Sequence, residues 1–167
     1  INLTIGQPDF ETPKSFRDAA KRSIDAGYNR YTETKGVLDL RKAISQKLKQ
    51  NGVVRSKDEI IVTAGTTSAI FMVLFSLIDQ GDEVIVFSPY FVAYTEIIKF
   101  VGGKAVVIKT DNNFQPSNIG LLKRSITAKT KAIIINSPNN PTGAVYSESA
   151  IADIVKVARK YGIYIIS

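Results

Sequence analysis

Short apolar runs alternate with segments of helical period along this chain, and that pattern limits its fold more than any other feature. The runs are continuous rather than interrupted by polar residues, which indicates strands that are covered on both faces. Repeated strand–helix units predict an α/β fold with a mostly parallel sheet. The predicted strands are Ile60–Thr63, Val84–Phe87, Ala105–Ile108, Ala132–Ile135 and Ile163–Ile166.

Two of the segments between these runs predict helices. The segment Ser68–Ile78 is apolar nearly all round, which is typical of a buried helix. The segment Ser147–Tyr161 instead places its apolar residues, among them Ile154 and Ala158, on one stripe. A single stripe predicts an amphipathic helix that covers the sheet.

Residues 1–55 have a different pattern and predict a separate segment of two helices. Thr12-Pro13 is typical of a helix start, and Gly27 is expected to end that first helix. The second helix is expected from about Val37 to Gln50, where Asn51-Gly52 stops it. We therefore predict one segment at 1–55 and an α/β domain at 56–167.

Two absences in the composition narrow the possible chemistry. The chain of 167 residues contains no cysteine and no histidine. This excludes disulfides, thiolate or histidine metal ligands and a Ser-His-Asp triad within it, and we expect no metal site. No apolar run approaches the ~20 residues of a membrane helix, and no signal peptide is present, so we expect a cytoplasmic protein without a membrane partner.

The charge balance is basic, with 22 Lys and Arg against 15 Asp and Glu. Such a balance favours an anionic ligand or nucleic acid. The densest basic patches, Arg41–Lys49 and Lys123–Lys131, are not interleaved with aromatic residues as a nucleic-acid surface would be. We interpret both patches as solvated helix and turn faces, and expect no nucleic-acid partner.

Three loops follow predicted strands, where parallel sheets bind their ligands. In the first, Thr63–Ser68, Gly65 permits a tight turn before a helix whose free amide groups and hydroxyls suit a phosphate. A simple helix cap is the alternative. In the second, Ser88–Phe91, an aromatic at the strand end is either a stacking surface for a flat ring or a core residue. The third, Asn136–Gly143, holds adjacent asparagine amides in a stiff loop.

Several motifs occur together in a family-specific order. They are Ile5-Gly6-Gln7-Pro8-Asp9-Phe10, Tyr31-Thr32 with Gly36, Thr63-Ala64-Gly65, Gly81-Asp82-Glu83-Val84, Ser88-Pro89-Tyr90 and Ser137-Pro138-Asn139-Asn140-Pro141-Thr142-Gly143. Together they resemble the amino-terminal part of class I/II aminotransferases, the fold-type I pyridoxal-phosphate enzymes. The resemblance implies the three-layer α/β/α sheet of that family's large domain, incomplete here. Residues 1–55 would then be the arm and part of the small domain, and 56–167 the first part of the cofactor-binding large domain.

The resemblance also implies a role for each matched residue, with pyridoxal 5'-phosphate as the cofactor. Gly65, Thr66 and Thr67 would hold the cofactor phosphate, and Phe91 would stack on its pyridine ring. Asn140 would bind the ring hydroxyl oxygen and contribute to substrate binding, and Gly6 would approach the substrate carboxylate. Tyr31 would reach the phosphate held by the other subunit of a homodimer.

The family's Schiff-base lysine has no counterpart here, nor have its pyridine-binding aspartate and its substrate-binding arginine. We therefore expect the chain to be a piece of a longer polypeptide whose remaining catalytic groups follow Ser167. In the family's sheet, the strand matching Ile60–Thr63 joins the others through two later strands. We accordingly predict that the isolated 167 residues neither catalyse amino transfer nor fold stably.

The expected reaction is transfer of an amino group between an amino acid and a 2-oxo acid. A β-lyase or a synthase on the same scaffold is an alternative with the same cofactor. A cofactor-free nucleotide-binding α/β module is an alternative of another class, but its Gly-x-Gly-x-x-Gly turn is represented only by Gly65. The substrate is not specified. Some relatives of the aspartate type carry lysine where Thr67 stands, so its absence weakens an assignment to aspartate without replacing it.

Overall fold

The computed structural model describes residues 6–167, so that Ile5 of the first motif lies outside the described part. The chain divides into two compact units, Ile1–Val62 and Thr63–Ser167. The predicted boundary lay after residue 55, and residues 56–62 group instead with the first unit. They do so because the short helix η1 (Lys57–Glu59) packs on α2 (Leu38–Gln50).

The first unit also contains α1 (Lys14–Asp25). Both helices predicted at 1–55 are present, with small differences at their starts. Pro13 is the residue that caps α1 rather than its first helical residue, and no side chain caps this helix. Gly27 follows α1 with a positive φ of 82°, a conformation that glycine adopts without strain.

The strand predicted at Ile60–Thr63 is wrong, because this segment joins no sheet in the described structure. Ile60 has extended backbone angles and is buried, so its local conformation agrees with the prediction. The amide of Val62, however, donates to the carbonyl of Lys35, which belongs to a loop (3.0 Å). A strand exists only as part of a hydrogen-bonded ladder, and this segment has no neighbouring strand in its unit.

The second unit is built on a four-stranded parallel sheet in the order β2-β1-β3-β4. The predicted strands after residue 80 are all present, with ends that differ by at most two residues. The strands are β1 (Glu83–Ser88), β2 (Lys104–Lys109), β3 (Thr130–Ile134) and β4 (Tyr164–Ile166), and the helices are α3 (Thr66–Leu77), α4 (Ala93–Phe100), α5 (Ile119–Ser125) and α6 (Glu148–Tyr161).

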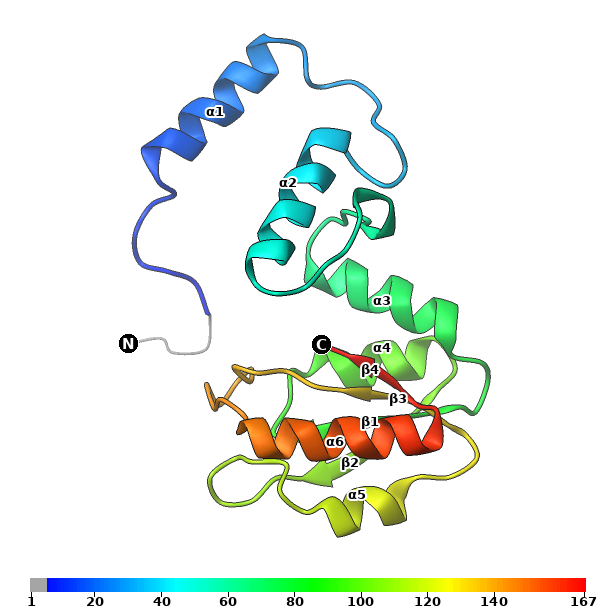
Figure 1. Ribbon diagram of the computed structural model, residues 1–167. Coiled ribbons are helices and arrows are strands. Elements are labelled where there is room, and N and C mark those ends of the chain that lie inside the picture. Colours follow the sequence, from blue (N-terminus) through cyan, green and yellow to red (C-terminus); the bar gives the residue numbers. More distant parts are fainter. Residues whose placement is uncertain (1–5) are drawn as a thin grey trace. The chain divides into compact units, whose positions relative to one another are not determined.

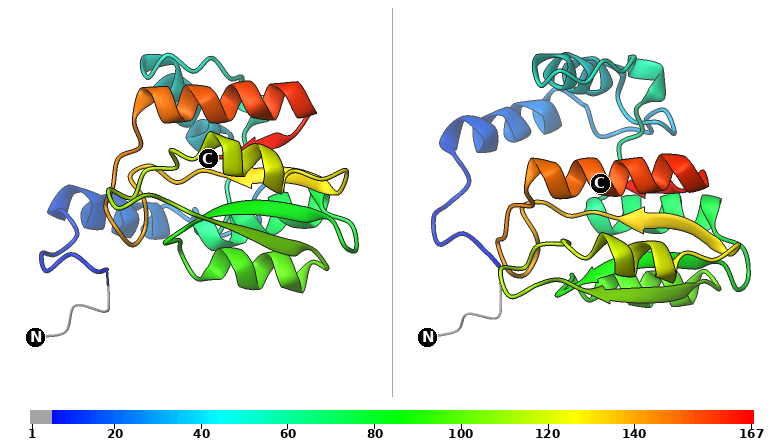
Figure 2. Two further views of the ribbon diagram at one scale, coloured as in Figure 1. Left: turned by 90° about the horizontal axis from the view of Figure 1, so that it is seen from below. Right: turned by 60° about the horizontal axis from the view of Figure 1, so that its bottom comes forward.

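Helices cover both faces of this sheet, which confirms the α/β fold in three layers (Figure 2). On one face, Ile85 and Ile133 pack with Ile154 of α6 and with residues of α5. On the other face, Val84 packs with Leu74 of α3 and with residues of α4. Successive strand residues point to opposite faces, so both faces need apolar residues. This is why the strands have continuous apolar runs.

The two predicted helices of this domain differ in outcome. In α6, Ser147 caps the first turn by accepting from the amide of Ala150 (3.2 Å), and Ile154 is fully buried as the stripe predicted. The prediction that α3 is buried all round is wrong. Leu74 is fully buried, but Phe75 is 68% exposed because only one side of α3 packs on the sheet. None of the helices in the described part is long and apolar enough to cross a membrane.

Candidate functional site

Two loops of the second unit meet at the end of the sheet where the strands finish, and a third loop leads into α3. The loop Ser88–Phe91 follows β1 and the loop Asn136–Gly143 follows β3. A hydrogen bond from the side chain of Asn139 to the carbonyl of Pro89 joins these two loops (3.0 Å). The third loop leads into α3, which lies on the other face of the sheet from α6 but begins toward the same end of it (Figure 1). The carboxyl end of a parallel sheet is the usual position of a ligand.

The start of α3 is an exposed helix end with free amide groups. Gly65 is its capping residue, with φ of 86°, and open space surrounds the position that a Cβ would take. The first amides of a helix have no acceptor within it, and here no side chain accepts from them either. Thr66 and Thr67 are exposed, and the first turn carries no acidic residue that would repel an anion.

Of the hydroxyls predicted to gather at this turn, some are already committed to the backbone. Thr63 Oγ1 donates to the carbonyl of Gly65 (3.0 Å), and Ser68 Oγ donates to the carbonyl of Ala64 (3.1 Å). Both bonds stabilise the turn itself. The hydroxyls of Thr66 and Thr67 make no such bond among the described residues, so they are left to face a ligand.

Phe91 combines the two roles that were considered for it, a core residue and a stacking surface for a flat ring. It is half-buried, and its ring meets that of Tyr94 edge-to-face, with centroids 5.6 Å apart. Burial raises the pKa of the Tyr94 hydroxyl, so this partner stays neutral at ordinary pH. Phe91 thus contributes to the core while a part of it stays accessible at the sheet end.

The two adjacent asparagines differ completely in environment. Asn140 is exposed, and its backbone amide donates to Asn136 Oδ1 (2.7 Å). Its side-chain amide has no partner within the described residues and is therefore open to a ligand. Asn139 is only 5% exposed, and its Nδ2 donates both to Pro89 and to Thr142 Oγ1, the latter at 2.9 Å.

Asn136 and Asn139 lie in the loop that was expected to hold rigid amides, but neither was expected to have a role of its own. Adjacent asparagines in a turn have the same local chemistry, and only the distant partner at Pro89 distinguishes Asn139. A cavity of about 10 Å³ lies among residues beneath these loops, including Asn139 and Tyr146. This volume holds at most one water molecule. This cavity is therefore too small to hold a flat ligand.

Two predicted site residues, Gly6 and Tyr31, belong to the first unit. Both are exposed, and the side chain of Tyr31 is entirely free of packing in this unit. The loop that carries Tyr31 also carries Glu33, whose carboxylate pairs with Arg41. Arg41 is only 3% exposed, so the interpretation of Arg41–Lys49 as a solvated basic face is wrong at this residue.

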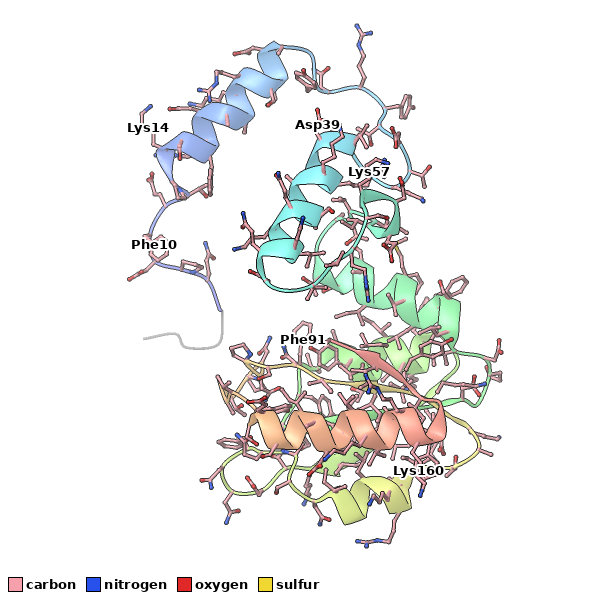
Figure 3. The ribbon with its side chains drawn as sticks, viewed as in Figure 1. Phe10, Lys14, Asp39, Lys57, Phe91 and Lys160 are labelled. Carbon is pink, nitrogen blue, oxygen red and sulfur yellow. The ribbon has the colours of Figure 1, made fainter. Side chains whose placement is uncertain are left out.

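The reason for this burial is a set of acceptors around the Arg41 guanidinium. Nε donates to the carbonyl of Gly36 and Nη1 to the carbonyl of Lys57, both at 3.0 Å, and the carboxylate of Asp58 lies 3.7 Å away. Lys57 is labelled in Figure 3. The guanidinium thus joins the Tyr31 loop, α2 and η1, and fixes the base of the loop within the first unit.

The comparisons with known proteins agree on one family. The family described as "Aminotransferase class I and II" matches residues 1–167. The chain is 46% identical over 170 aligned residues to a probable aspartate aminotransferase of Methanocaldococcus jannaschii, and 39% identical to the aspartate/prephenate aminotransferase of Thermus thermophilus. In both alignments it is covered completely but spans 44% of the relative's length.

Solved structures agree with this result. The aspartate aminotransferase of Thermotoga maritima matches all of the chain with a TM-score of 0.95 and 42% identity, and 45% of that protein is covered. An alanine aminotransferase from Pyrococcus furiosus matches 95% of the chain with a TM-score of 0.91 and 39% identity, with 41% of its own length covered. Similar folds therefore occur in proteins named for two different amino acids.

Proposed function

The chain belongs to the class I and II aminotransferases, and from this premise we propose that the protein containing it transfers an amino group between an amino acid and a 2-oxo acid. Pyridoxal phosphate is the proposed cofactor. The observation that carries the proposal is the exposed start of α3, with free amides and no acidic residue, in the same unit as the free amide of Asn140.

The residues at the sheet end fit this cofactor in chemistry. A phosphate dianion suits the amides and hydroxyls of Thr66 and Thr67, because the helix end adds partial positive charge. The space beside Gly65 admits the close approach of a phosphate oxygen. Asn140 offers an amide donor to a ring oxygen, and the accessible part of Phe91 offers an apolar face to a flat ring.

In this proposal, the protein binds and orients while the cofactor supplies the electron sink for reactions at the amino acid's α-carbon. Thr66 and Thr67 anchor the phosphate, and Phe91 restricts the tilt of the ring. Asn140 holds the ring oxygen and lies near the substrate. Gly6 approaches the substrate carboxylate with its backbone.

Further parts of the proposal concern the whole protein. Tyr31 reaches the phosphate bound by the other subunit of a homodimer, and its free hydroxyl is compatible with that role. The lysine that carries the cofactor lies outside this chain. A cytoplasmic location and the division into an arm with part of a small domain and part of a large domain remain predictions.

The substrate follows from the relatives only as a first choice for assay. Thr67, in place of a lysine, argues against aspartate, but two of the relatives are named for aspartate, so we choose aspartate as the first amino donor to test. A β-lyase or synthase remains the alternative with the same cofactor. The two reactions separate cleanly, since a β-lyase releases ammonia from one substrate whereas amino transfer requires a 2-oxo acid acceptor.

Cofactor titration tests the binding part of this proposal. We expect pyridoxal phosphate to bind the protein with a new visible absorbance band, and the double variant Thr66→Val/Thr67→Val to bind it about tenfold more weakly, because hydrogen bonds to a charged group are lost. Ser68→Ala is the matched control, since its hydroxyl is already bonded to Ala64. Absence of binding by the wild-type protein would refute the proposal.

A product assay tests the reaction. With aspartate and 2-oxoglutarate, we expect equal amounts of glutamate and oxaloacetate and no ammonia. Ammonia formed without an acceptor would instead support the β-lyase. If aspartate is inactive, alanine is the next donor, because one of the similar structures is named for it.

A further inference from the structure

The most informative contact outside the residues already assigned is the buried amide of Asn139. Asn139 comes directly before Asn140, yet it points into the protein whereas its neighbour is exposed. The backbone of Asn139 is held on both sides: its amide donates to the carbonyl of Ala144 (2.9 Å) and its carbonyl accepts from Gly143 (2.7 Å). Its side chain therefore leaves the loop in a fixed direction.

The side chain in this direction meets two acceptors on different loops. One is the carbonyl of Pro89, which comes two residues before Phe91, and the other is the hydroxyl oxygen of Thr142. Both bonds need an N–H donor, and the amide nitrogen carries two. A carboxylate of the same shape has none, and an alkyl side chain leaves both acceptors unpaired.

This bridge lies where the sheet itself no longer connects the two loops. The paired register of β1 and β3 ends at Val86 and Ile134. Beyond that pair, the hydrogen bond from Asn139 to Pro89 again joins the segments that follow the two strands. The distance between the Phe91 loop and the Asn140 loop therefore depends on this side chain.

We infer that Asn139 is a positioning residue, which holds the loop of Asn140 against the loop of Phe91. In this position Phe91 contacts the face of the cofactor ring while Asn140 contacts the oxygen at its edge. The inference rests on the proposed function, because that function supplies the ring. Asn139 acts through its neighbours and does not contact the ligand. A local misplacement of about 1 Å at a site can cost roughly a hundredfold in rate, so a bridge of this kind matters.

The test compares Asn139→Leu and Asn139→Asp in the full protein that contains this chain. Both lose the donors, but only one adds a charge. We expect both to bind pyridoxal phosphate about tenfold more weakly and to alter the visible circular dichroism of the bound cofactor, because the ring sits in a changed environment. Asn112→Leu, the same change at an exposed loop residue, is expected to alter neither.

A second substitution distinguishes positioning from general destabilisation. In an Asn140→Ala background, Asn139→Leu is expected to weaken cofactor binding less than it does alone, because its effect passes partly through Asn140. Asn139→Ser, which keeps one donor, serves if the larger changes prevent folding. Fully additive effects of the two substitutions would overturn this inference but not the proposed function. The same holds if the wild-type protein binds the cofactor normally and the Asn139 variants show unchanged affinity and dichroism. A wild-type protein that does not bind the cofactor overturns the proposed function, and this inference with it.

Discussion

Each of the two units of this chain is stabilised internally by a different kind of interaction. The second unit has an apolar cluster on each face of its sheet, with Ile133, Ile154 and Leu74 fully buried. Among residues 6–62, the buried side chains are those of Arg41 and Ile60, and α1 has none. One unit is thus organised by apolar burial and the other around a guanidinium.

This difference predicts how the stability of each unit should respond to substitution. Apolar burial is not directional and is shared by many residues, so it resists small rearrangements but is costly to empty. A guanidinium has fixed donor directions, and each acceptor must be in place. We therefore expect damage in the second unit to be large and widespread, and damage around Arg41 to stay local.

The largest effect is expected from emptying the core of the second unit. Ile133→Ala removes a fully buried side chain from the central region of the sheet. We expect a loss of about 3–4 kcal/mol in the free energy of unfolding, since truncation leaves a cavity in a packed interior. Urea unfolding of the full protein that contains this chain measures this loss. Val145→Ala, at a 67% exposed position, is the control and should change it by less than about 0.5 kcal/mol.

A somewhat smaller and more local effect is expected at Arg41. Arg41→Met keeps much of the length but removes every donor, which leaves the carbonyls of Gly36 and Lys57 unpaired. We expect a loss of about 2–3 kcal/mol in local stability, seen as faster hydrogen exchange in residues 28–36 and 57–60.

Two comparisons make the Arg41 prediction specific. Arg41→Lys should recover little, because an ammonium cannot match the fork of acceptors. Lys42→Met on the same helix is the control, since Lys42 is exposed and, among residues 6–167, forms its one ion pair with Asp39 (3.3 Å). Equal acceleration of exchange in both units would show that the Arg41 network is not a local device.

Sequence patterns predicted the second unit well because its signal is local. The runs at Val84–Phe87 and Ala132–Ile134 lie in buried strands, since strands covered on both faces have few polar positions. The same reasoning was wrong at Ile60–Thr63. Whether an apolar run becomes a strand depends on a neighbouring strand, which the run itself does not specify.

The candidate site shows a similar division. A glycine before a helix predicted the turn at Gly65, whose positive φ the structure contains. The environments of Asn139 and Arg41 were not predictable, because their partners lie 50 and 16 residues away along the chain. The family resemblance assigned a role to Asn140, but it gave no role to the buried asparagine that precedes it.

A modest effect is expected at a helix start, where the two units again differ. Ser147 caps α6 with its side chain, whereas no side chain caps α1. Ser147→Ala should therefore lower stability by about 1 kcal/mol, measured by urea unfolding. Ser76→Ala, near the end of α3, is the control and should have a smaller effect. An unchanged midpoint for Ser147→Ala would mean that water replaces the cap.

The smallest effect is expected from acid, and it should be confined to the second unit. The Thr127 hydroxyl donates to Glu83 (2.6 Å) and lowers the pKa of this carboxyl, although burial opposes the shift. Because the pKa is lower in the folded state, ionised Glu83 stabilises the fold above the ordinary glutamate pKa. This contribution disappears as the pH falls through the lowered pKa.

The first unit also has carboxyls of lowered pKa, but they should contribute little to acid sensitivity. The pKa of Asp58 is lowered by a hydrogen bond from Lys57, and that of Glu59 by the backbone amide of Ser56. Both side chains are more than half exposed, so that solvent screens these interactions.

Glu83→Gln separates the buried carboxyl from the exposed ones. At neutral pH the variant should be slightly less stable than wild type, and the two should converge as the pH falls, because wild type loses its charge and the variant has none. Unfolding midpoints measured from neutral to acid pH give the two curves. Parallel curves would place the acid response elsewhere, with Asp111 the next carboxyl to replace because the backbone amide of Gln115 lowers its pKa. Convergence would instead show that, even in the unit built on apolar burial, one hydrogen-bonded charge at the start of a central strand sets the response to acid.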